Sequence, residues 1–241
     1  MICLKKLATE KHQPNEEQMD VLLQVKTRIL TEVELEKEGP GLLRLLKKSA
    51  IQDPREDPLC AFVHGEPGTG KSRVIGWITR LMREALKWEH GKEFVCAAFQ
   101  NKVAYLMGGC GMTLHSCADI PIGKQQQDRK LDHGDVDILF TRNQHLRWIL
   151  FDEAPMIPDE LLGLFAANFQ SAARDTSRYK KRADKSLRAF GGYNVMMFGD
   201  TQQIPPIPAS SALFLPPVKK KSRLPNQTRY SNCFNCFLNM D

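Results

Sequence analysis

Long apolar stretches are missing from this 241-residue sequence, and so is the apolar core of an N-terminal signal peptide. A membrane-spanning helix needs about 20 consecutive apolar residues, so we expect a protein without a membrane partner. No internal repeat is visible either. The remaining composition, 42% hydrophobic and 26% charged, is ordinary for a soluble protein with one large domain or a domain with appendages.

Paired cysteines are also lacking. The seven cysteines are an odd number and are scattered along the chain, several of them in apolar surroundings. This pattern indicates reduced thiols in an intracellular compartment. Cys233 and Cys236 form a single C-x-x-C, and a zinc site there is disfavoured because no second ligand pair lies nearby.

Charge of one sign is only slightly in excess. The formal net charge of +6 permits a polyanionic partner, but a solvated surface explains it equally well. The strongest concentration of Lys and Arg, at residues 174–188, is open to the same two interpretations.

The sequence does contain one complete phosphate-binding loop of the form G-x-x-x-x-G-K-S. Its positions are Gly65, Glu66, Pro67, Gly68, Thr69, Gly70, Lys71 and Ser72. In such loops backbone N–H groups surround nucleotide phosphates, the lysine reaches the terminal phosphates, and the hydroxyl helps to hold Mg²⁺. An apolar run before the loop predicts a buried strand, and helical periodicity after it predicts a helix whose positive N-terminus faces the phosphates.

Strands and helices alternate from residue 59 onward, which predicts an α/β domain with a mainly parallel sheet flanked by helices. The expected strands are 59–64, 93–99, 147–152 and 193–199. The expected helices are 71–88, 101–107 and 158–174, and the polar stretch 123–137 is expected to be an exposed loop.

The chain is expected to divide into three parts. Residues 1–58 form an N-terminal helical approach, with helices at 16–30 and 42–50. Residues 59–215 form the α/β domain. Residues 216–241 lack clear periodicity, and we expect an irregular, loose tail there.

Two adjacent carboxylates, Asp152 and Glu153, stand at the end of the apolar strand 147–152. Ligands of open α/β sheets bind at the carboxyl ends of the strands. A carboxylate at that edge can hold Mg²⁺, and its neighbour can orient or deprotonate an attacking water. Combined with the phosphate loop, the pair indicates that the nucleotide is hydrolysed and not merely bound.

A third apolar strand leads into Gly199 and Asp200, followed by two glutamines and then Pro205 and Pro206. A neutral glutamine beyond a strand end can hydrogen-bond the γ-phosphate, and the two prolines would fix the loop that carries it. Gln203 is therefore the candidate γ-phosphate sensor, although composition alone is also consistent with a surface turn.

Taken in order, these motifs resemble the Pif-type DNA helicases of superfamily one, subgroup B, including the helicase modules of Helitron-like transposons. The matching segments are 14–18, 65–72, 108–116, 150–157 (LFDEAPMI) and 198–206 (FGDTQQIPP). The resemblance covers about residues 13–215. It implies a RecA-like P-loop NTPase fold, here the first motor lobe of an ATP-dependent DNA helicase.

The resemblance also implies roles for single residues. ATP and Mg²⁺ would bind through residues 65–72, and Gln18 would read the adenine. The catalytic residues would be Lys71, Asp152, Glu153 and Gln203, and the metal ligands would be Ser72 and Asp152. Single-stranded DNA would face 97–104 and 113–115, where His115 is either a DNA contact or an ordinary packed histidine.

Movement in the 5′-to-3′ direction, roles in DNA repair, recombination and telomere maintenance, and a nuclear location in a eukaryote are implied in the same way. The family's second motor lobe is not found in this sequence. Translocation needs two lobes that close and reopen around ATP, so we expect weak or no unwinding from this chain alone.

Two other functions stay open. The irregular end of the chain is consistent with a catalytically incomplete fragment that binds nucleotide or nucleic acid without turnover. An ATPase that acts on protein is the third hypothesis, and the basic stretch 174–188 argues mildly against it.

Overall fold

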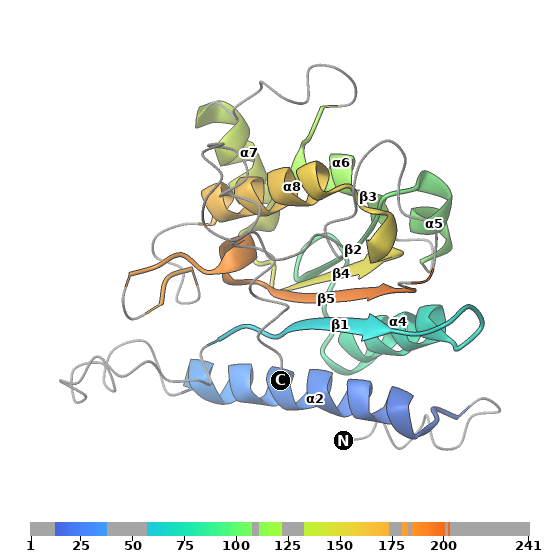
Figure 1. The fold of residues 1–241 in the computed structure, drawn as a ribbon. Helices are drawn as coiled ribbons and strands as arrows, with labels where there is room; N and C mark the ends of the chain where they lie inside the picture. The colour runs from blue at the N-terminus through green and yellow to red at the C-terminus, as the bar shows by residue number, and fades with distance from the viewer. Residues whose placement is uncertain are drawn as a thin grey trace, which may run out of the picture.

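The computed structural model describes residues 13–37, 57–107, 111–121, 133–173, 180–182, 185–200 and 202. Its centre is a five-stranded parallel sheet in the order β1-β5-β4-β2-β3 (Figure 1). The strands are β1 (Cys60–His64), β2 (Phe94–Ala98), β3 (Met112–Thr113), β4 (Trp148–Asp152) and β5 (Asn194–Gly199). All four predicted strands are present within one residue of their expected ends, and the predicted parallel α/β sheet is confirmed.

Both faces of the sheet are buried, which is why its central strands read as continuous apolar runs. Successive residues along a strand point to opposite faces, so each strand contributes to two cores. One core contains Val95, Ala97, Ile149, Phe151, Val195 and Met197. The other contains Phe94, Cys96, Ala98, Trp148, Leu150, Met196 and Phe198.

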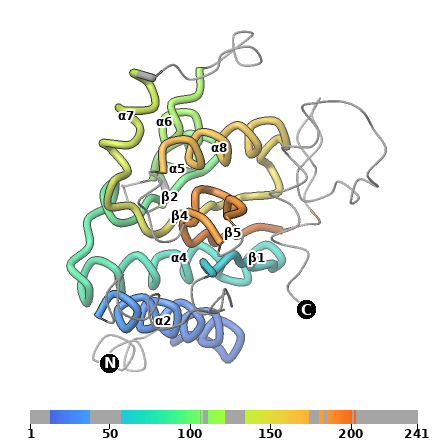
Figure 2. The backbone as a smooth tube through the Cα atoms, turned by 90° about the vertical axis from the view of Figure 1, so that its left-hand side faces the viewer, coloured from blue at the N-terminus to red at the C-terminus, as the bar shows by residue number. Residues whose placement is uncertain are grey.

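Helices cover the sheet on both sides. Figures 1 and 2 place α2 (Glu16–Lys37) beside α4 (Lys71–Arg80) on one face. The core on that face also takes in Ala104 and Met107, from the region of α5 (Asn101–Leu106). On the opposite face lie α6 (Leu114–Ala118), α8 (Asp159–Ala172) and the short helix η5 (Ala189–Gly192).

An aromatic cluster fills the core beneath α8. Phe165 stacks on Phe169 at 4.4 Å between ring centroids and meets Phe151 of β4 edge-on at 5.1 Å. Phe190 of η5 completes the cluster and is fully buried. These contacts fix α8 over the strand that ends in the acidic pair.

The sequence prediction missed two helices, the short α6 and a longer helix over residues 133–143. Residues 133–137, expected to be part of an exposed loop, begin α7 (His133–Asn143), which packs against α8. The polar composition concealed this helix, because Leu139 is its fully buried apolar residue while Ile138 stays 58% exposed. The two-residue strand β3 was also missed, and it is too short to show a pattern.

Other boundaries differ less. Helix α2 continues seven residues past its predicted end at Leu30, to Lys37. The helix expected over 71–88 is α4 followed by η2 (Leu81–Ala85), a π-helical turn. The predicted helix at 42–50 and the tail at 216–241 lie outside the described residues. Within the described part of the chain, no helix is both long and apolar enough to cross a bilayer.

Candidate active site

The candidate site lies at one edge of the sheet, where β1, β4 and β5 end. Their arrowheads point the same way in Figure 1, so the phosphate loop after β1 and the carboxylates after β4 reach a common edge. Strand β5 separates β1 from β4. The amide of Gly65 donates to the carbonyl oxygen of Gly199 at 3.2 Å, which ties the phosphate loop to the end of β5.

Glycines give the phosphate loop its shape. Gly68 and Gly70 have φ angles of +83° and +90°, a region that other residues rarely adopt. Inside the loop, the Thr69 amide and hydroxyl both donate to the carbonyl of Glu66, at 3.3 and 2.8 Å. Gly70 is also the N-cap of α4, so the positive end of that helix opens into the loop.

Lys71 lies across this loop. Its ammonium group donates to the carbonyl oxygens of Gly65 and Glu66, at 2.6 and 3.0 Å. The positive charge is therefore held within the loop itself, where a phosphate would meet it together with the amides of the first turn of α4.

Asp152 ends β4 and is only 5% exposed. Burial raises the pKa of its carboxyl above the ordinary value, and the charge of Glu153 acts in the same direction. A hydrogen bond from the Glu153 amide at 3.0 Å, the charge of Lys71 and a hydrogen bond with the Ser72 side chain oppose this increase. The structure thus brings Lys71, Ser72 and Asp152 together, as the sequence predicted.

The donor set fits Mg²⁺. A hydroxyl and a carboxylate are hard oxygen ligands, and Mg²⁺ in nucleotide sites uses one or two such protein groups, with phosphates and water supplying the rest. No cluster of three or more His, Cys, Asp or Glu side chains among the described residues could bind a metal by itself. A protein-only metal site is therefore not part of the described structure.

Glu153 has an unusual backbone. Its φ of +50° and ψ of +44° are left-handed, a conformation that is strained for a residue with a side chain. Its Oε2 atom is buried and has no hydrogen-bond partner among the described residues. Strain and an unsatisfied buried carboxylate oxygen are both typical of functional positions.

Gln18 reaches the phosphate loop from α2. Its Nε2 donates to the carbonyl of Thr69 at 2.8 Å, although the two residues are 51 positions apart in sequence. Asn15 holds Gln18 in place, because each side chain accepts a hydrogen bond from the other's backbone amide, at 2.8 and 3.1 Å. The candidate adenine-reading residue therefore lies against the loop.

Comparison with known proteins agrees with this geometry. A family model described as PIF1-like helicase matches residues 35–223. The chain belongs to this family.

Individual relatives are helicases several times longer than the matched region. The chain is 31% identical over 156 residues to the ATP-dependent DNA helicase PIF1 of Saccharomyces cerevisiae, an alignment that covers 61% of this chain and 15% of the yeast protein. It is 29% identical over 177 residues to ATP-dependent DNA helicase Pif1 of Bdellovibrio bacteriovorus, with 73% of this chain and 34% of that protein covered.

The crystal structure of the Pif1 helicase from Candida albicans aligns with a TM-score of 0.52 and 23% identity over 81% of this chain and 34% of that chain. This similarity confirms the fold. The described sheet and the family membership together support a RecA-like α/β motor lobe.

The remaining predicted site residues divide into two groups. Gln203 and residues 108–110 lie outside the described residues, so the sensor role of Gln203 stays a prediction. Asp200 is 1% exposed at the end of β5, and its Oδ1 accepts a hydrogen bond from the Gln202 amide at 2.9 Å. The start of the predicted sensor loop is thus anchored at the same edge as the acidic pair.

The segment predicted to face DNA lies further along this edge. Thr113 caps α6 by accepting a hydrogen bond from the Ser116 amide at 3.2 Å. The ring of His115 lies 6.5 Å from that of Phe99, and burial lowers the pKa of His115. His115 is therefore a partly packed side chain whose burial favours the neutral form, and both earlier interpretations of it remain open.

Two features of the site had no clear signal in the sequence. The left-handed backbone of Glu153 cannot be read from a strand that ends in Asp-Glu. The tight packing of Gly199 on Pro155 is equally hidden: a Cβ on Gly199 would lie 2.1 Å from the proline Cδ. The N-x-x-Q spacing of Asn15 and Gln18, similar to a capping box, agrees with the predicted start of α2 at Glu16.

Proposed function

We propose that this chain is an ATP-hydrolysing motor lobe that acts on single-stranded DNA. The observation that carries the proposal is the meeting of the phosphate loop with the acidic pair, where Lys71 and Ser72 both favour the charged form of Asp152. Ser72 lies in the first turn of α4, which follows β1, and Asp152 ends β4, so the two meet at one edge of the sheet. Membership of the PIF1-like helicase family supports the same assignment.

Each site residue has a role that follows from its position. Ser72 and Asp152 would hold Mg²⁺, which when bound neutralises phosphate charge and favours attack at the γ-phosphate. Lys71 would exchange its two loop carbonyls for phosphate oxygens. Lys71 and Ser72 favour the charged, metal-binding form of Asp152, and burial opposes them by raising its pKa.

Glu153 would orient the attacking water and accept its proton. Its buried Oε2 has no partner among the described residues, so this atom is available to a water molecule that enters with the nucleotide. The left-handed backbone turns the residue at the end of β4, immediately after the metal ligand. Gln18 would contact the adenine from its position against Thr69.

Single-stranded DNA would lie along the carboxyl ends of β2 and β3. Strand β2 ends at Ala98 beside Thr113 of β3, so the predicted DNA-facing segments 97–104 and 113–115 are neighbours. Tyr105 on α5 is 78% exposed in this region, and exposed aromatic rings allow bases to stack without sequence preference. The curated relatives are named as DNA helicases, which fits this placement.

A comparison of three variants tests the assignment. Lys71→Ala should abolish ATP binding, measured by fluorescent-nucleotide titration. Glu153→Gln should bind ATP with unchanged affinity but hydrolyse it at least about 100-fold more slowly in a single-turnover assay. Lys92 is an exposed lysine at the opposite edge of the sheet, and Lys92→Ala is the matched control. It should leave ATP affinity and the hydrolysis rate unchanged.

Stimulation of hydrolysis by single-stranded DNA, with binding that weakens steeply as salt rises, would support the motor function. Turnover by Glu153→Gln at the parent rate would contradict the catalytic role. ATP binding without any hydrolysis by the parent chain, with or without DNA, would favour the incomplete nucleotide-binding fragment instead.

A further inference from the structure

A second cavity lies at the opposite edge of the sheet from the phosphate loop. It has a volume of about 300 Å³, and its lining includes Glu32, Glu36, Trp88, Glu93, Arg147 and Tyr193. Tyr193, Arg147 and Glu93 each directly precede a strand of the sheet, β5, β4 and β2 in turn. The cavity is therefore separate from the nucleotide site and has no role in the proposed hydrolysis.

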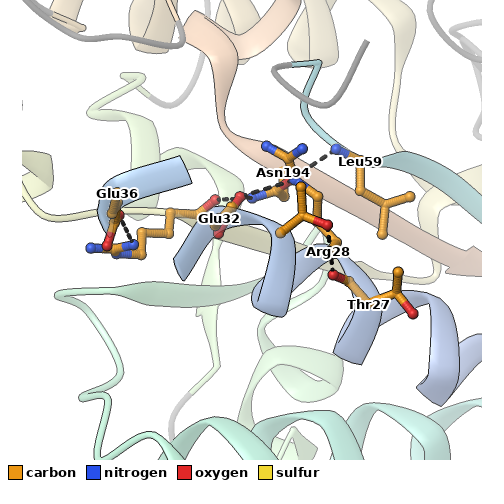
Figure 3. A network of polar contacts seen from close by, with 8 residues as sticks. Thr27, Arg28, Glu32, Glu36, Leu59 and Asn194 are labelled. Atoms are coloured by element: carbon orange, nitrogen blue, oxygen red, sulfur yellow. Dashed lines mark hydrogen bonds and ion pairs between the residues drawn. The ribbon is translucent and has the colours of Figure 1, made fainter. Parts of the chain in front are cut away.

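Glu32 is the most unusual residue of this cavity. It is 4% exposed, and its Oε1 accepts hydrogen bonds from Arg28 Nε at 3.1 Å and from the side-chain amide of Asn194 (Figure 3). Its Oε2 is buried and has no hydrogen-bond partner among the described residues. Burial raises the pKa of Glu32 even though Arg28, Asn194 and Arg147 all lower it.

A buried carboxylate oxygen without a hydrogen-bond partner is destabilising. Such an atom is expected to be retained where a donor reaches it in the working state of the protein. Glu32 lines the cavity, and a small rotation of its carboxylate would turn the enclosed Oε2 toward a donor that enters the cavity and supplies the missing hydrogen bond.

Two aromatic side chains form walls of the cavity, and a residue with positive φ precedes each. Lys87 before Trp88 has a φ of +59°, and Gly192 before Tyr193 has a φ of +86°. Tyr193 is further fixed by an edge-to-face contact with Phe169, at 5.8 Å between centroids. Rings held in this way offer π faces, which attract cations and pack well against alkyl chains.

The lining is acidic. It contains three carboxylates, those of Glu32, Glu36 and Glu93, and one guanidinium, that of Arg147. Arg147 is already paired with Glu36 and lies 5.5 Å from the centre of the Trp88 ring. That contact shows that the cavity accommodates a guanidinium. Arg28 and Lys92 pair with Glu32 and Glu93 from outside the lining, so the lining group still without a partner in the described part of the chain is Oε2 of Glu32.

We propose that this cavity binds an organic cation, whose ammonium or guanidinium group donates to Glu32 Oε2 while its alkyl chain packs on Trp88 and Tyr193. The volume fits the lower range of small-ligand sites. A bare metal ion fits less well, because no group of three metal-binding side chains exists among the described residues. The cation can be a free amine or the side chain of a Lys or Arg residue in a peptide.

Butylguanidine and butylurea provide the first test, because they have nearly the same shape and differ in charge. In isothermal titration calorimetry, the full chain should bind butylguanidine with at least 10-fold higher affinity than butylurea. Glu32→Gln keeps an acceptor for Arg28 and Asn194 but removes the charge, and it should lose the butylguanidine affinity by at least 10-fold. Glu34→Gln, an exposed position on the same helix, is the matched control and should bind like the parent.

A second set of measurements guards against loss of folding. Glu36→Gln changes an exposed side chain at the rim, so it should fold normally and bind butylguanidine several-fold more weakly. ATP affinity should be unchanged in Glu32→Gln and Glu36→Gln, which separates this site from the nucleotide site. Equal binding of butylurea and butylguanidine, or full affinity in both variants, would overturn the proposal.

The source of the cation is distinguished by two further probes. Agmatine represents a free amine, and an N-acetylated, C-amidated Gly-Arg-Gly peptide represents a protein side chain. Binding of agmatine alone identifies a small-molecule site, and tighter binding of the peptide identifies a docking site for a basic segment. Failure of both probes to bind at millimolar concentration would refute the inference.

Discussion

The contact between the end of β5 and the turn after β4 gives the sharpest prediction of the structure. In Gly199→Ala the new Cβ would lie 2.1 Å from Cδ and 2.8 Å from Cγ of Pro155. Nonbonded carbon atoms prefer about 3.5–4.0 Å, so one partner must move by about 1.4 Å. The proline ring is rigid and belongs to η4 (Ala154–Met156), so the turn itself has to shift.

Overpacking of this kind is destabilising by about 1–3 kcal/mol. For a chain of this size that corresponds to a fall in Tm of about 2–12 °C. The displaced turn begins directly after Glu153, and a displacement of about 1 Å at a catalytic group can reduce a rate about 100-fold. We therefore expect hydrolysis to fall by at least about 10-fold while ATP affinity changes little.

Gly76→Ala is the matched control. Gly76 is exposed within α4, and a Cβ there would meet no atom within 4 Å. This substitution should stabilise the protein by about 0.5–1 kcal/mol, because alanine is the better helix former. Thermal denaturation and a single-turnover ATPase assay measure both variants. Gly199→Ala with parent stability and parent turnover would refute the packing argument.

Three further predictions concern single residues. Glu153→Gly should relieve the left-handed strain and raise the free energy of unfolding by about 0.5–1 kcal/mol while hydrolysis is lost; a lower urea midpoint would contradict this. Asn194→Ala should lower the free energy of unfolding by about 2–4 kcal/mol, because Arg28, Glu32 and the Leu59 amide all lose a hydrogen-bond partner. An unchanged urea midpoint would count against that network. Burial lowers the pKa of His90 to about 4 from 6.5, so the unfolded chain takes up the proton first and stability should fall as the pH drops below 6.5. Between pH 7 and 5 the free energy of unfolding should fall by about 1–2 kcal/mol after allowance for the partial exposure of His90. His90→Gln should remove most of this dependence of stability on pH.

The sequence predicted the sheet well because its strands are buried on both faces. Runs such as Trp148–Asp152 have no polar face, and within an α/β alternation such runs indicate parallel strands. The phosphate loop and the acidic pair were equally visible, since their chemistry requires fixed residue types at fixed spacing. That combination was sufficient to place Lys71, Ser72 and Asp152 at one edge.

What the sequence could not show depends on contacts between distant segments. The polar helix α7 was missed because its stability comes from packing on α8, which its own residues do not reveal. The second cavity was missed for the same reason: Glu32, Trp88 and Tyr193 are far apart in sequence and meet only in the folded chain. The left-handed conformation of Glu153 is likewise imposed by the fold.

Helix α2 joins the two ends of the molecule. Gln18, in its first turn, contacts the phosphate loop, and Glu32, near its other end, lines the second cavity. Its 22 residues span about 33 Å, and Leu22, Val25 and Ile29 pack into the core on the face of the sheet that α2 covers. A version of the chain that started at Leu59 would therefore lack α2, and with it one side of the phosphate loop and one wall of the second cavity. The apolar residues that α2 covers would then be exposed to water.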